Sequence, residues 1–253
     1  MQHIPIRTNT SFSIRDINGQ NMVQPLHRHD FYYLLILQKG AGTHSIDFID
    51  YPVSDHSIFL LRPGQVHAIN LHSSSTGYLV QFNPGFDPSP LLRTAAQQNY
   101  YQLENTLALC TQIVEEFSNP KEKHEEVIKS LLHIFFIHLI RAQKTPPAND
   151  QLQILQELIA TNITTHKQVA DYAALLHLSP YQLNAITKSS LGKTCSTLIN
   201  DHIILEAKRQ LLATTNLINE IAWQLGYEDV SYFIRFFKKH TGQTPESFRQ
   251  NFK

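Results

Sequence analysis

The stretch from Asn216 to Arg249 constrains the fold of this 253-residue chain more than any other part. Its first apolar residues recur at i, i+3, i+4 and i+7, the spacing of one helix face. These residues are Ile218, Ile221, Ala222 and Leu225. Asn216 can cap the start of this helix, and Gly226 stands where a left-handed residue would end it. The pattern predicts a short helix followed by a tight turn.

A second short helix is predicted directly after this turn. Asp229 can cap it, Gly242 can end it, and Thr244-Pro245 can begin another helix with proline at its first position. Its apolar side consists of Val230, Phe233, Ile234 and Phe237, and its polar side of Ser231, Tyr232, Arg235 and Lys239. Two short helices joined by a tight turn form a helix-turn-helix, which places its second helix in the major groove of DNA. The spacing alone also fits an ordinary helical hairpin with a solvated cationic face.

The same pattern occurs once more, earlier in the chain. Ala173 precedes Ala222 by 49 residues, and Leu183 precedes Phe233 by 50. The one-residue difference falls in the turn, where an insertion disturbs least. The sequence therefore predicts two helix-turn-helix units.

The two predicted units differ at two inward positions. His177 stands in place of the turn glycine, and Thr187 stands in place of Phe237. We therefore expect the first unit to be less firmly packed. Between the units, residues 195–212 contain no Gly or Pro and predict one long helix. That helix would hold the two recognition helices about 34 Å apart, as one face of DNA requires.

The residues of the second unit also resemble a known family. IAxxLGYxDxSYFxRFFKKxxGxTPxxFR is similar to the C-terminal signature of the AraC-type transcription regulators, and SPYQLNxxxK resembles the first recognition helix of that family. The resemblance implies a DNA-binding domain over residues 151–253 and double-stranded promoter DNA as its partner. The candidate DNA contacts are Tyr181, Gln182, Asn184, Lys188, Ser231, Tyr232, Arg235, Lys238 and Lys239. Arg235 falls where the signature has its arginine, so we expect it to read a base, whereas Lys239 should contact phosphate.

The charge of the chain is unusual for a DNA-binding protein. Lys and Arg number 21, as do Asp and Glu, and the part after residue 145 carries 10 of the former and 9 of the latter. Any electrostatic attraction to DNA must therefore be local, near the recognition helices. We expect modest affinity per domain, helped by dimerisation.

The N-terminal part has a β texture from Ser11 to Phe82. Short runs rich in Phe, Tyr, Ile and Val are SFSIRDI, FYYLLIL, THSIDFI, HSIFLL and YLVQF. Turn clusters between them are Lys39-Gly40-Ala41-Gly42, Arg62-Pro63-Gly64 and Asn83-Pro84-Gly85. Many short strands at close spacing predict a barrel or a double-sheet jelly roll. The fold class is therefore α+β with two domains.

Histidines occur in this region at metal-ligand spacing. His27 and His29 form an HxH pair, and His67 lies on a later predicted strand. This arrangement resembles the cupin motifs, and AraC-type regulators often carry such a barrel as their sensor. A metal-binding cupin usually has a carboxylate four residues after the second histidine, where this chain has Tyr33. Three neutral imidazoles can still hold zinc, but we expect hydrogen-bonding or pocket-lining histidines, with no tightly bound metal or other cofactor.

A barrel interior is the default place for a small-molecule effector. The candidate lining residues are His27, His29, Phe31, Tyr33, His44 and His67. Strand alternation leaves open that half of them face outward.

Residues 100–143 predict helices, and the run from 125 to 142 is apolar on much of its circumference. Such a helix must be covered on more than one side. AraC-type proteins dimerise through a helix of this kind, so the resemblance implies a homodimer. The candidate seam is Ile128, Leu131, Leu132, Phe135 and Leu139. A purely intramolecular packing is the alternative.

Domain boundaries follow from these patterns. We expect a sensor barrel over 1–98, a helical dimerisation element over 99–144, a Pro-Pro linker over 145–150 and the DNA-binding domain over 151–253. No apolar run is long enough to cross a membrane. Cys110 and Cys195 are typical of reduced thiols, and the start lacks a signal-peptide core, so we expect a cytoplasmic protein.

Three functions fit parts of the sequence. The first is a non-enzymatic transcription regulator that responds to an effector and contacts DNA, with RNA polymerase as a possible further partner. The second is a cupin-type metalloenzyme or ligand-binding barrel with a helical tail, which Tyr33 disfavours. The third is a helical protein–protein adaptor, which the outward Arg and Lys residues disfavour. The effector, the promoter and the choice between activator and repressor do not follow from the sequence.

Overall fold

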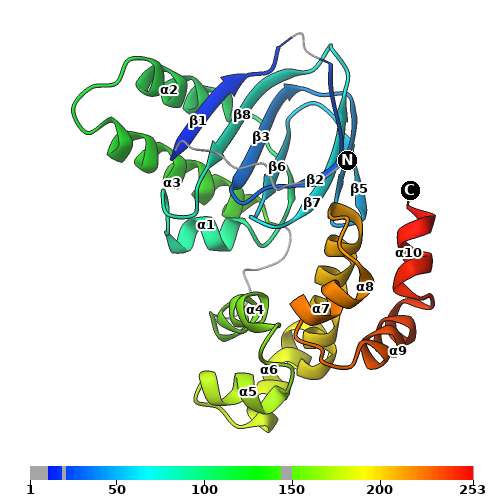
Figure 1. Cartoon of the computed structure of the whole chain (residues 1–253). Helices are drawn as coiled ribbons and strands as arrows, with labels where there is room; N and C mark the ends of the chain where they lie inside the picture. Colours follow the sequence, from blue (N-terminus) through cyan, green and yellow to red (C-terminus); the bar gives the residue numbers. More distant parts are fainter. Residues whose placement is uncertain (1–10, 19–20, 144–149, 253) are drawn as a thin grey trace. The chain divides into compact units, whose positions relative to one another are not determined.

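A computed structural model describes residues 11–18, 21–143 and 150–252. The chain divides into two compact units, one up to residue 143 and one from residue 150 on (Figure 1). All but the last residue of the predicted 145–150 linker lie outside the described residues.

The N-terminal unit is built from two antiparallel sheets (Figure 1). The five-stranded sheet has the order β1 (Phe12–Asp16), β8 (Thr76–Phe82), β3 (Tyr32–Lys39), β6 (Ser57–Leu61) and β9 (Tyr100–Gln102). The four-stranded sheet has the order β2 (Met22–Arg28), β7 (Val66–Leu71), β4 (Gly42–Ile46) and β5 (Ile49–Val53). The predicted α+β class and the double-sheet barrel are confirmed.

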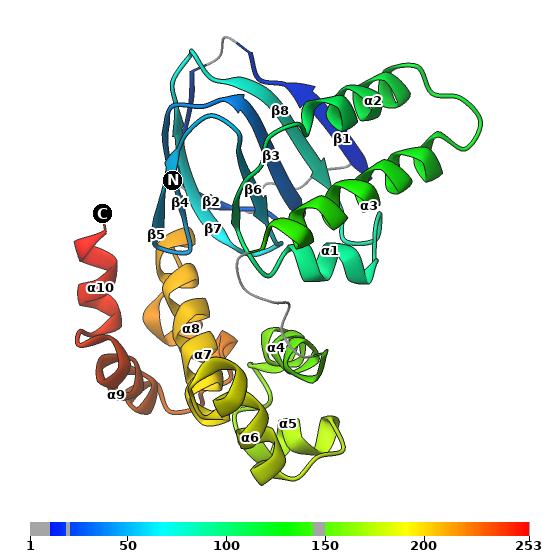
Figure 2. The same ribbon diagram turned by 180° about the vertical axis from the view of Figure 1, so that it is seen from behind.

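Strand β3 shows why this unit has two cores. Its successive side chains point to opposite faces of the sheet. Tyr33 and Leu35 are buried among residues of both sheets, in the barrel interior. Leu34 and Ile36 pack instead against the helices α1 (Pro90–Ala95), α2 (Leu107–Ser118) and α3 (His124–Ala142). These helices cover the outer face of the five-stranded sheet (Figure 2). A strand buried on both faces reads as a continuous apolar run.

Two segments differ from the sequence prediction. The run THSIDFI is not one strand, because Asp47 and Phe48 have φ of 49° and 69° and turn β4 back into β5. Two left-handed residues suit a tight hairpin turn, and Asp47 tolerates that conformation better than most residues. Residues 100–102 are not helical but form the edge strand β9, which pairs with β6. The aromatic Tyr100-Tyr101 pair favours a strand there.

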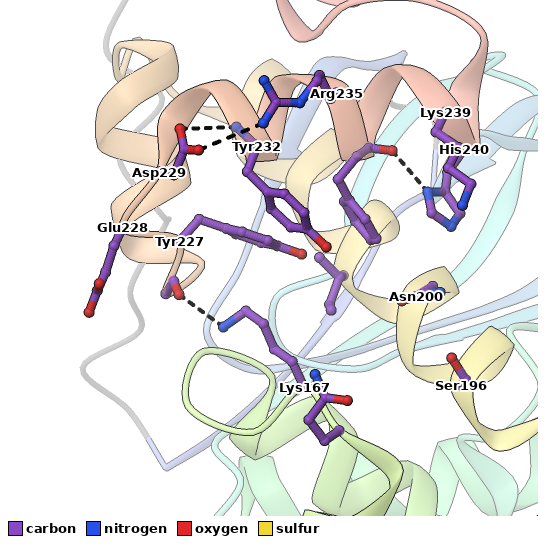
Figure 3. Close-up of a pocket in the computed structure, with 14 residues that line it drawn as sticks. Lys167, Ser196, Asn200, Tyr227, Glu228, Asp229, Tyr232, Arg235, Lys239 and His240 are labelled. Carbon is purple, nitrogen blue, oxygen red and sulfur yellow. Dashed lines mark hydrogen bonds and ion pairs between the residues drawn. The ribbon is translucent and has the colours of Figure 1, made fainter.

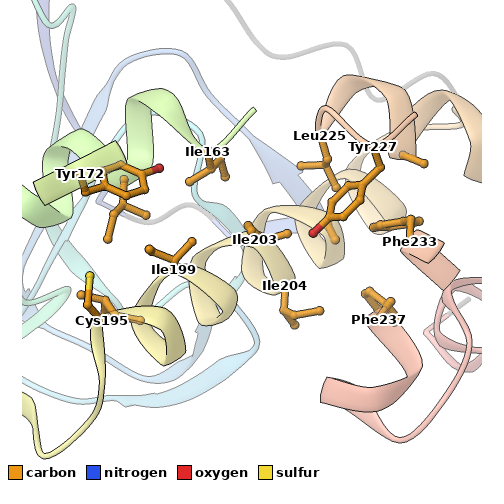
Figure 4. Close-up of a cluster of buried hydrophobic side chains, with 14 of the residues drawn as sticks. Ile163, Tyr172, Cys195, Ile199, Ile203, Ile204, Leu225, Tyr227, Phe233 and Phe237 are labelled. Carbon is orange, nitrogen blue, oxygen red and sulfur yellow. The ribbon is translucent and has the colours of Figure 1, made fainter. Parts of the chain in front are cut away.

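The C-terminal unit is entirely helical. Its elements are α4 (Asp150–Asn162), α5 (Val169–Leu175), α6 (Pro180–Leu191), α7 (Cys195–Ala213), α8 (Ile218–Gln224), α9 (Val230–Thr241) and α10 (Pro245–Asn251). Helix α7 is the predicted long helix, and its 19 residues span about 28 Å. Ile199 and Ile203 on α7 are buried, and Figure 4 shows Tyr172 of the first unit and Phe233 of the second on either side of them. One helix therefore supplies the core of both repeats.

Both cysteines are buried and free. Burial raises the pKa of the Cys110 thiol to about 12 and that of Cys195 to about 11. Over the described ranges, no helix is both long enough and apolar enough to cross a membrane.

Candidate nucleic-acid interface and sensor site

Helix α9 is fixed at both ends by its caps. The Asp229 carboxylate accepts hydrogen bonds from the backbone N–H of Ser231 at 2.8 Å and of Tyr232 at 3.1 Å. At the other end Gly242 has φ of 81°, and its N–H donates to the carbonyl of Lys238 at 2.8 Å. These two predicted caps are confirmed, and they set the directions in which the α9 side chains project.

The start of α8 is capped differently from the prediction. The Glu220 carboxylate accepts from the backbone N–H of Leu217 at 2.7 Å, whereas the side chain of Asn216 donates to Gln224 at 3.2 Å. A carboxylate in the first helical turn satisfies an otherwise unpaired N–H and favours the helix dipole. The prediction that Asn216 caps α8 is therefore wrong.

The polar face of α9 is open to solvent. Phe233 and Phe237 are fully buried, and the five candidate DNA contacts of this helix are exposed. Those five are Ser231, Tyr232, Arg235, Lys238 and Lys239. The guanidinium of Arg235 lies 3.7 Å from the Asp229 carboxylate, with both side chains more than 60% exposed. An ion pair this exposed is weak and leaves Arg235 available.

Helix α6 has the same layout with different residues. The Ser179 hydroxyl accepts from the N–H of Gln182 at 3.2 Å, and the Gln182 amide oxygen accepts from the N–H of Ser179 at 2.9 Å. Tyr181 is 84% exposed, and Gln182 and Lys188 are exposed as well. Ser179 is thus the N-cap of α6, as Asp229 is of α9.

Asn184 is placed differently from the other candidates on α6. Its amide nitrogen donates to the carbonyl of Pro180 at 3.0 Å, and its amide oxygen accepts from the N–H of Cys195 at 3.0 Å. Both ends of the amide are thus used within the chain, and the residue is half-buried. We assign Asn184 to holding the start of α7 against α6, which its sequence position did not indicate.

The two recognition helices share one burial plan. Residues 181–190 and residues 231–240 have the same succession of buried, half-buried and exposed side chains, position by position. Buried Leu183 matches Phe233, and buried Thr187 matches Phe237. The repeat at an offset of 50 is therefore present in three dimensions as well as in sequence.

The two turns differ in how closely they are packed. Gly226 has φ of 75°, and a Cβ built there would lie 1.8 Å from the backbone oxygen of Thr164. His177 has φ of 54° and is exposed. The left-handed turn residue predicted at Gly226 is confirmed, and His177 adopts the same left-handed conformation with an exposed side chain.

Lys167 ties the loop before the first unit to the turn of the second. Its ammonium donates to the carbonyls of Thr164 at 3.0 Å and Gly226 at 3.1 Å, and it lies 5.0 Å from the ring centroid of Tyr227 (Figure 3). Partial burial lowers the pKa of Lys167. The sequence analysis missed this residue because no motif contains it.

A groove of about 770 Å³ lies beside α9. Lys167, the α7 residues Ser196 and Asn200, and the α9 residues Arg235 and Lys239 line it (Figure 3). Its wall combines three cationic side chains and small polar ones with two carboxylates, those of Glu228 and Asp229, and with the rings of Tyr227 and Tyr232.

In the barrel, the structure brings all six candidate lining residues together. Every one of them is less than 10% exposed. The His29 ring lies 4.4 Å from that of Phe31, and the Tyr33 ring lies 4.9 Å from that of His67, centroid to centroid. The alternative that half of them face outward is not what the structure shows, because all six are buried, those on β2 of one sheet and on β3 of the other alike.

The barrel histidines are hydrogen-bonded to one another. His29 Nε2 lies 2.8 Å from His67 Nε2, and His67 Nδ1 lies 2.9 Å from His44 Nε2. Burial, and then the neighbouring His27, lower the pKa of His29 and of His44 to about 3. Burial and the surrounding histidines also lower the pKa of His67 well below its ordinary value. All three imidazoles are therefore neutral at pH 7.

The predicted dimer seam on α3 is mostly internal. Ile128, Leu132, Phe135 and Leu139 are fully buried in the core beneath the five-stranded sheet, and Leu131 is half-buried. These four side chains are not available to a second subunit in this fold. The helix packs this apolar face against the outward-facing residues of β3 and β8.

Comparisons with known proteins agree with both units. A family model described as an AraC-like ligand binding domain matches residues 12–135, and a helix-turn-helix domain model matches residues 172–251. The uncharacterized HTH-type transcriptional regulator YfiF of Bacillus subtilis is 27% identical over 251 residues, covering 90% of this chain and 79% of its own. The transcriptional activator RhaR of Yersinia pestis is 22% identical, with coverages of 89% and 84%.

Solved structures also resemble the chain. ToxT from Vibrio cholerae O395 is 18% identical with a TM-score of 0.49, over 94% of this chain and 97% of that one. The C-terminal domain of the response regulator yesN from Fusobacterium nucleatum is 31% identical with a TM-score of 0.37, over 40% and 99%.

Proposed function

The chain belongs to the AraC-type transcription regulators, with an N-terminal ligand-binding domain and a C-terminal helix-turn-helix DNA-binding domain, and we propose that α6 and α9 read two successive major grooves on one face of promoter DNA. The observation that carries this proposal is the shared burial plan of the two helices, which leaves the same polar positions exposed on both. Helix α7, about 28 Å long, links the two recognition helices, which have to lie about 34 Å apart to enter successive major grooves.

The exposed side chains divide into two roles. Arg235 can donate two hydrogen bonds to guanine O6 and N7, which discriminates that base by about 1–3 kcal/mol. Tyr181, Gln182, Ser231 and Tyr232 lie at the start of each recognition helix, where base edges are contacted. Lys188, Lys238 and Lys239 lie farther along and suit phosphate, which gives affinity without sequence information.

Selection from a random-sequence duplex library tests this proposal with the full chain. We expect enriched sites that contain two short motifs with centres about one helical turn apart. Gln182→Ala should relax preference in one motif and Arg235→Ala in the other, while Asn184→Gln should leave both motifs intact. Enrichment of a single motif, with both variants acting on it, would contradict the two-groove arrangement.

The barrel interior is the proposed effector site. The six buried aromatic and imidazole residues supply stacking surfaces together with hydrogen-bonding nitrogens, as small-molecule sites do.

We assign residues 1–98 to this sensor, 99–144 to dimerisation and 151–253 to DNA binding. Since the named relatives are bacterial, we place the protein in the cytoplasm with its DNA. By analogy with the transcriptional activator RhaR, we propose activation through contact with RNA polymerase.

We propose that the homodimer uses a face of α3 next to the predicted one. Val127, Leu131, Ile134 and His138 recur at i, i+4, i+7 and i+11, and Val127 and Ile134 are about 40% exposed or more. A groove of about 300 Å³ between α2 and α3, lined by Val127 and Leu131, adjoins this stripe. Light scattering on Val127→Glu/Ile134→Glu should give a folded monomer. An unchanged mass, with the circular dichroism of the parent, would reject this face.

A further inference from the structure

Three histidines of the proposed effector site form a cluster in which their ring nitrogens converge. One ring nitrogen from each of His27, His29 and His67 lies within 4.8 Å of the other two. His27 and His67 are paired across β2 and β7, and His29 follows directly after β2. Burying three imidazoles at one point costs free energy unless each ring nitrogen has a hydrogen-bond partner or binds an ion.

The hydrogen bonds of two of these rings fix which nitrogen faces the centre. His27 Nδ1 lies 2.7 Å from the carbonyl oxygen of Pro25, so Nδ1 carries the proton and Nε2 keeps its lone pair. His67 Nδ1 lies 2.9 Å from His44 Nε2 and can donate to it in the same way. Metal-binding histidines nearly always donate their other ring N–H to an oriented acceptor. Pro25 and His44 occupy that position here.

The distances are close to those of a tetrahedral ion. Nitrogens bound to zinc at about 2.0–2.1 Å lie about 3.3 Å apart. His29 Nε2 and His67 Nε2 are 2.8 Å apart, so a separation of about 0.5 Å more would admit the ion.

Tyr33 leaves one coordination position open. A phenol ordinarily has a pKa near 10 and stays protonated at neutral pH, so the Tyr33 hydroxyl is a poor metal ligand. Its hydroxyl instead lies 3.9 Å from the Met22 sulfur. Three histidines with an open fourth position form the donor set of several zinc sites.

We propose that the barrel binds one divalent transition-metal ion of the zinc class through Nε2 of His27, His29 and His67, with His44 as a positioning residue. No carboxylate completes the ligand set, and His44 orients His67 from behind, with its Nε2 at 2.9 Å from His67 Nδ1. The fourth position then accepts water or an oxygen atom of the effector. This site depends on barrel residues alone, so a failure of the DNA-binding proposal leaves it standing.

Zinc titration of the full chain, stripped of metal with a chelator, tests the proposal. We expect one zinc per chain by calorimetry and elemental analysis. His27→Ala and His67→Ala should each weaken binding at least about 100-fold, whereas His72→Ala, an exposed histidine outside the cluster, should not change it. Equal zinc binding by folded His67→Ala and parent chains would overturn the proposal.

His44 has its own test. His44→Phe removes the acceptor behind His67 and should weaken zinc about 10–100-fold without changing the stoichiometry. His44→Gln keeps an acceptor oxygen and should recover most of that loss. If both variants bind zinc as the parent does, His44 is not a positioning residue.

Cobalt substitution decides the matter without any variant that could misfold. A Co²⁺ ion held by three imidazoles in four-coordinate geometry gives strong visible absorption, whereas six-coordinate Co²⁺ on surface carboxylates gives almost none. We expect strong bands that saturate at one equivalent and disappear when zinc is added. Weak bands, or bands that keep rising past one equivalent, would overturn the site.

Discussion

The two helix-turn-helix units follow one plan with different anchors. In the second unit, Phe237 lies 6.2 Å from Phe233 and 5.7 Å from Phe248, ring centroid to ring centroid. In the first unit, the matching residue is Thr187, whose hydroxyl donates to the carbonyl of Asn184 at 3.1 Å. The same buried position is thus filled by an aromatic ring in one unit and by a short hydrogen-bonded side chain in the other.

This difference shows which features both helix-turn-helix units require and which can vary between them. Both units keep an N-cap on the recognition helix, a left-handed turn residue and a buried residue eight positions after the N-cap. They do not share aromatic packing, a crowded turn or the number of cations. The backbone plan therefore tolerates a smaller core in the first unit, where Asn184 adds polar contacts to α7.

The largest expected difference between the units concerns the buried position itself. Phe237→Ala should lower the free energy of unfolding by about 3–5 kcal/mol, because a fully buried ring leaves a cavity. Thr187→Ala should cost about 1 kcal/mol, mainly one hydrogen bond. Urea unfolding followed by circular dichroism measures both. Equal losses would mean that the two cores contribute alike.

The crowded turn gives the next largest effect. Asparagine tolerates the left-handed region, so the same substitution at both turns isolates the effect of packing. Gly226→Asn should destabilise by about 3 kcal/mol, because its Cβ meets the Thr164 oxygen. His177→Asn should change stability by less than about 0.5 kcal/mol, since that turn is exposed. Thermal unfolding distinguishes them, and a small effect of Gly226→Asn would show that the loop at Thr164 moves aside.

The third largest expected effect concerns Arg235, the residue proposed to read a base. The position of Arg235 is occupied by the exposed Ala185 in the first unit. Arg235→Ala should cost about 1–3 kcal/mol on a selected site and flatten preference at one base pair. Binding to random DNA should stay nearly unchanged. If binding to both kinds of DNA weakens equally while the chain stays folded, Arg235 contacts the backbone only.

The smallest expected effect is on the salt dependence of DNA binding, which reports the lysines that contact phosphate. Lys239→Ala should weaken binding to all sequences alike and reduce the salt slope by about 1. Ser189 is the equivalent residue of the first unit, and Ser189→Lys should raise the slope by about 1 if α6 lies against a phosphate in the same way. Fluorescence anisotropy over a range of salt concentrations measures the slope. An unchanged slope in Ser189→Lys would mean that the two helices meet DNA at different angles.

The sequence by itself determined the repeated units, the residues that begin their recognition helices and the class of each domain. Caps such as Ser179 and Asp229, the turn at Gly226 and the apolar spacing of α8 depend on interactions within a few residues, so they can be read locally. The signature over 221–249 then indicated the family. The double-sheet barrel followed from short apolar runs separated by Gly and Pro.

Only the tertiary structure decided which faces meet. Helix α3 has apolar residues on several sides, and its contact with the five-stranded sheet buries Phe135 and leaves Ile134 exposed. The pairing of β4 with β7 brings His44 to His67, and the fold of the loop at Lys167 brings that residue to Gly226. These contacts join residues 23 to 59 positions apart in the chain. Local periodicity fixes the direction of a side chain on its own element, but strand register and helix docking decide what it meets.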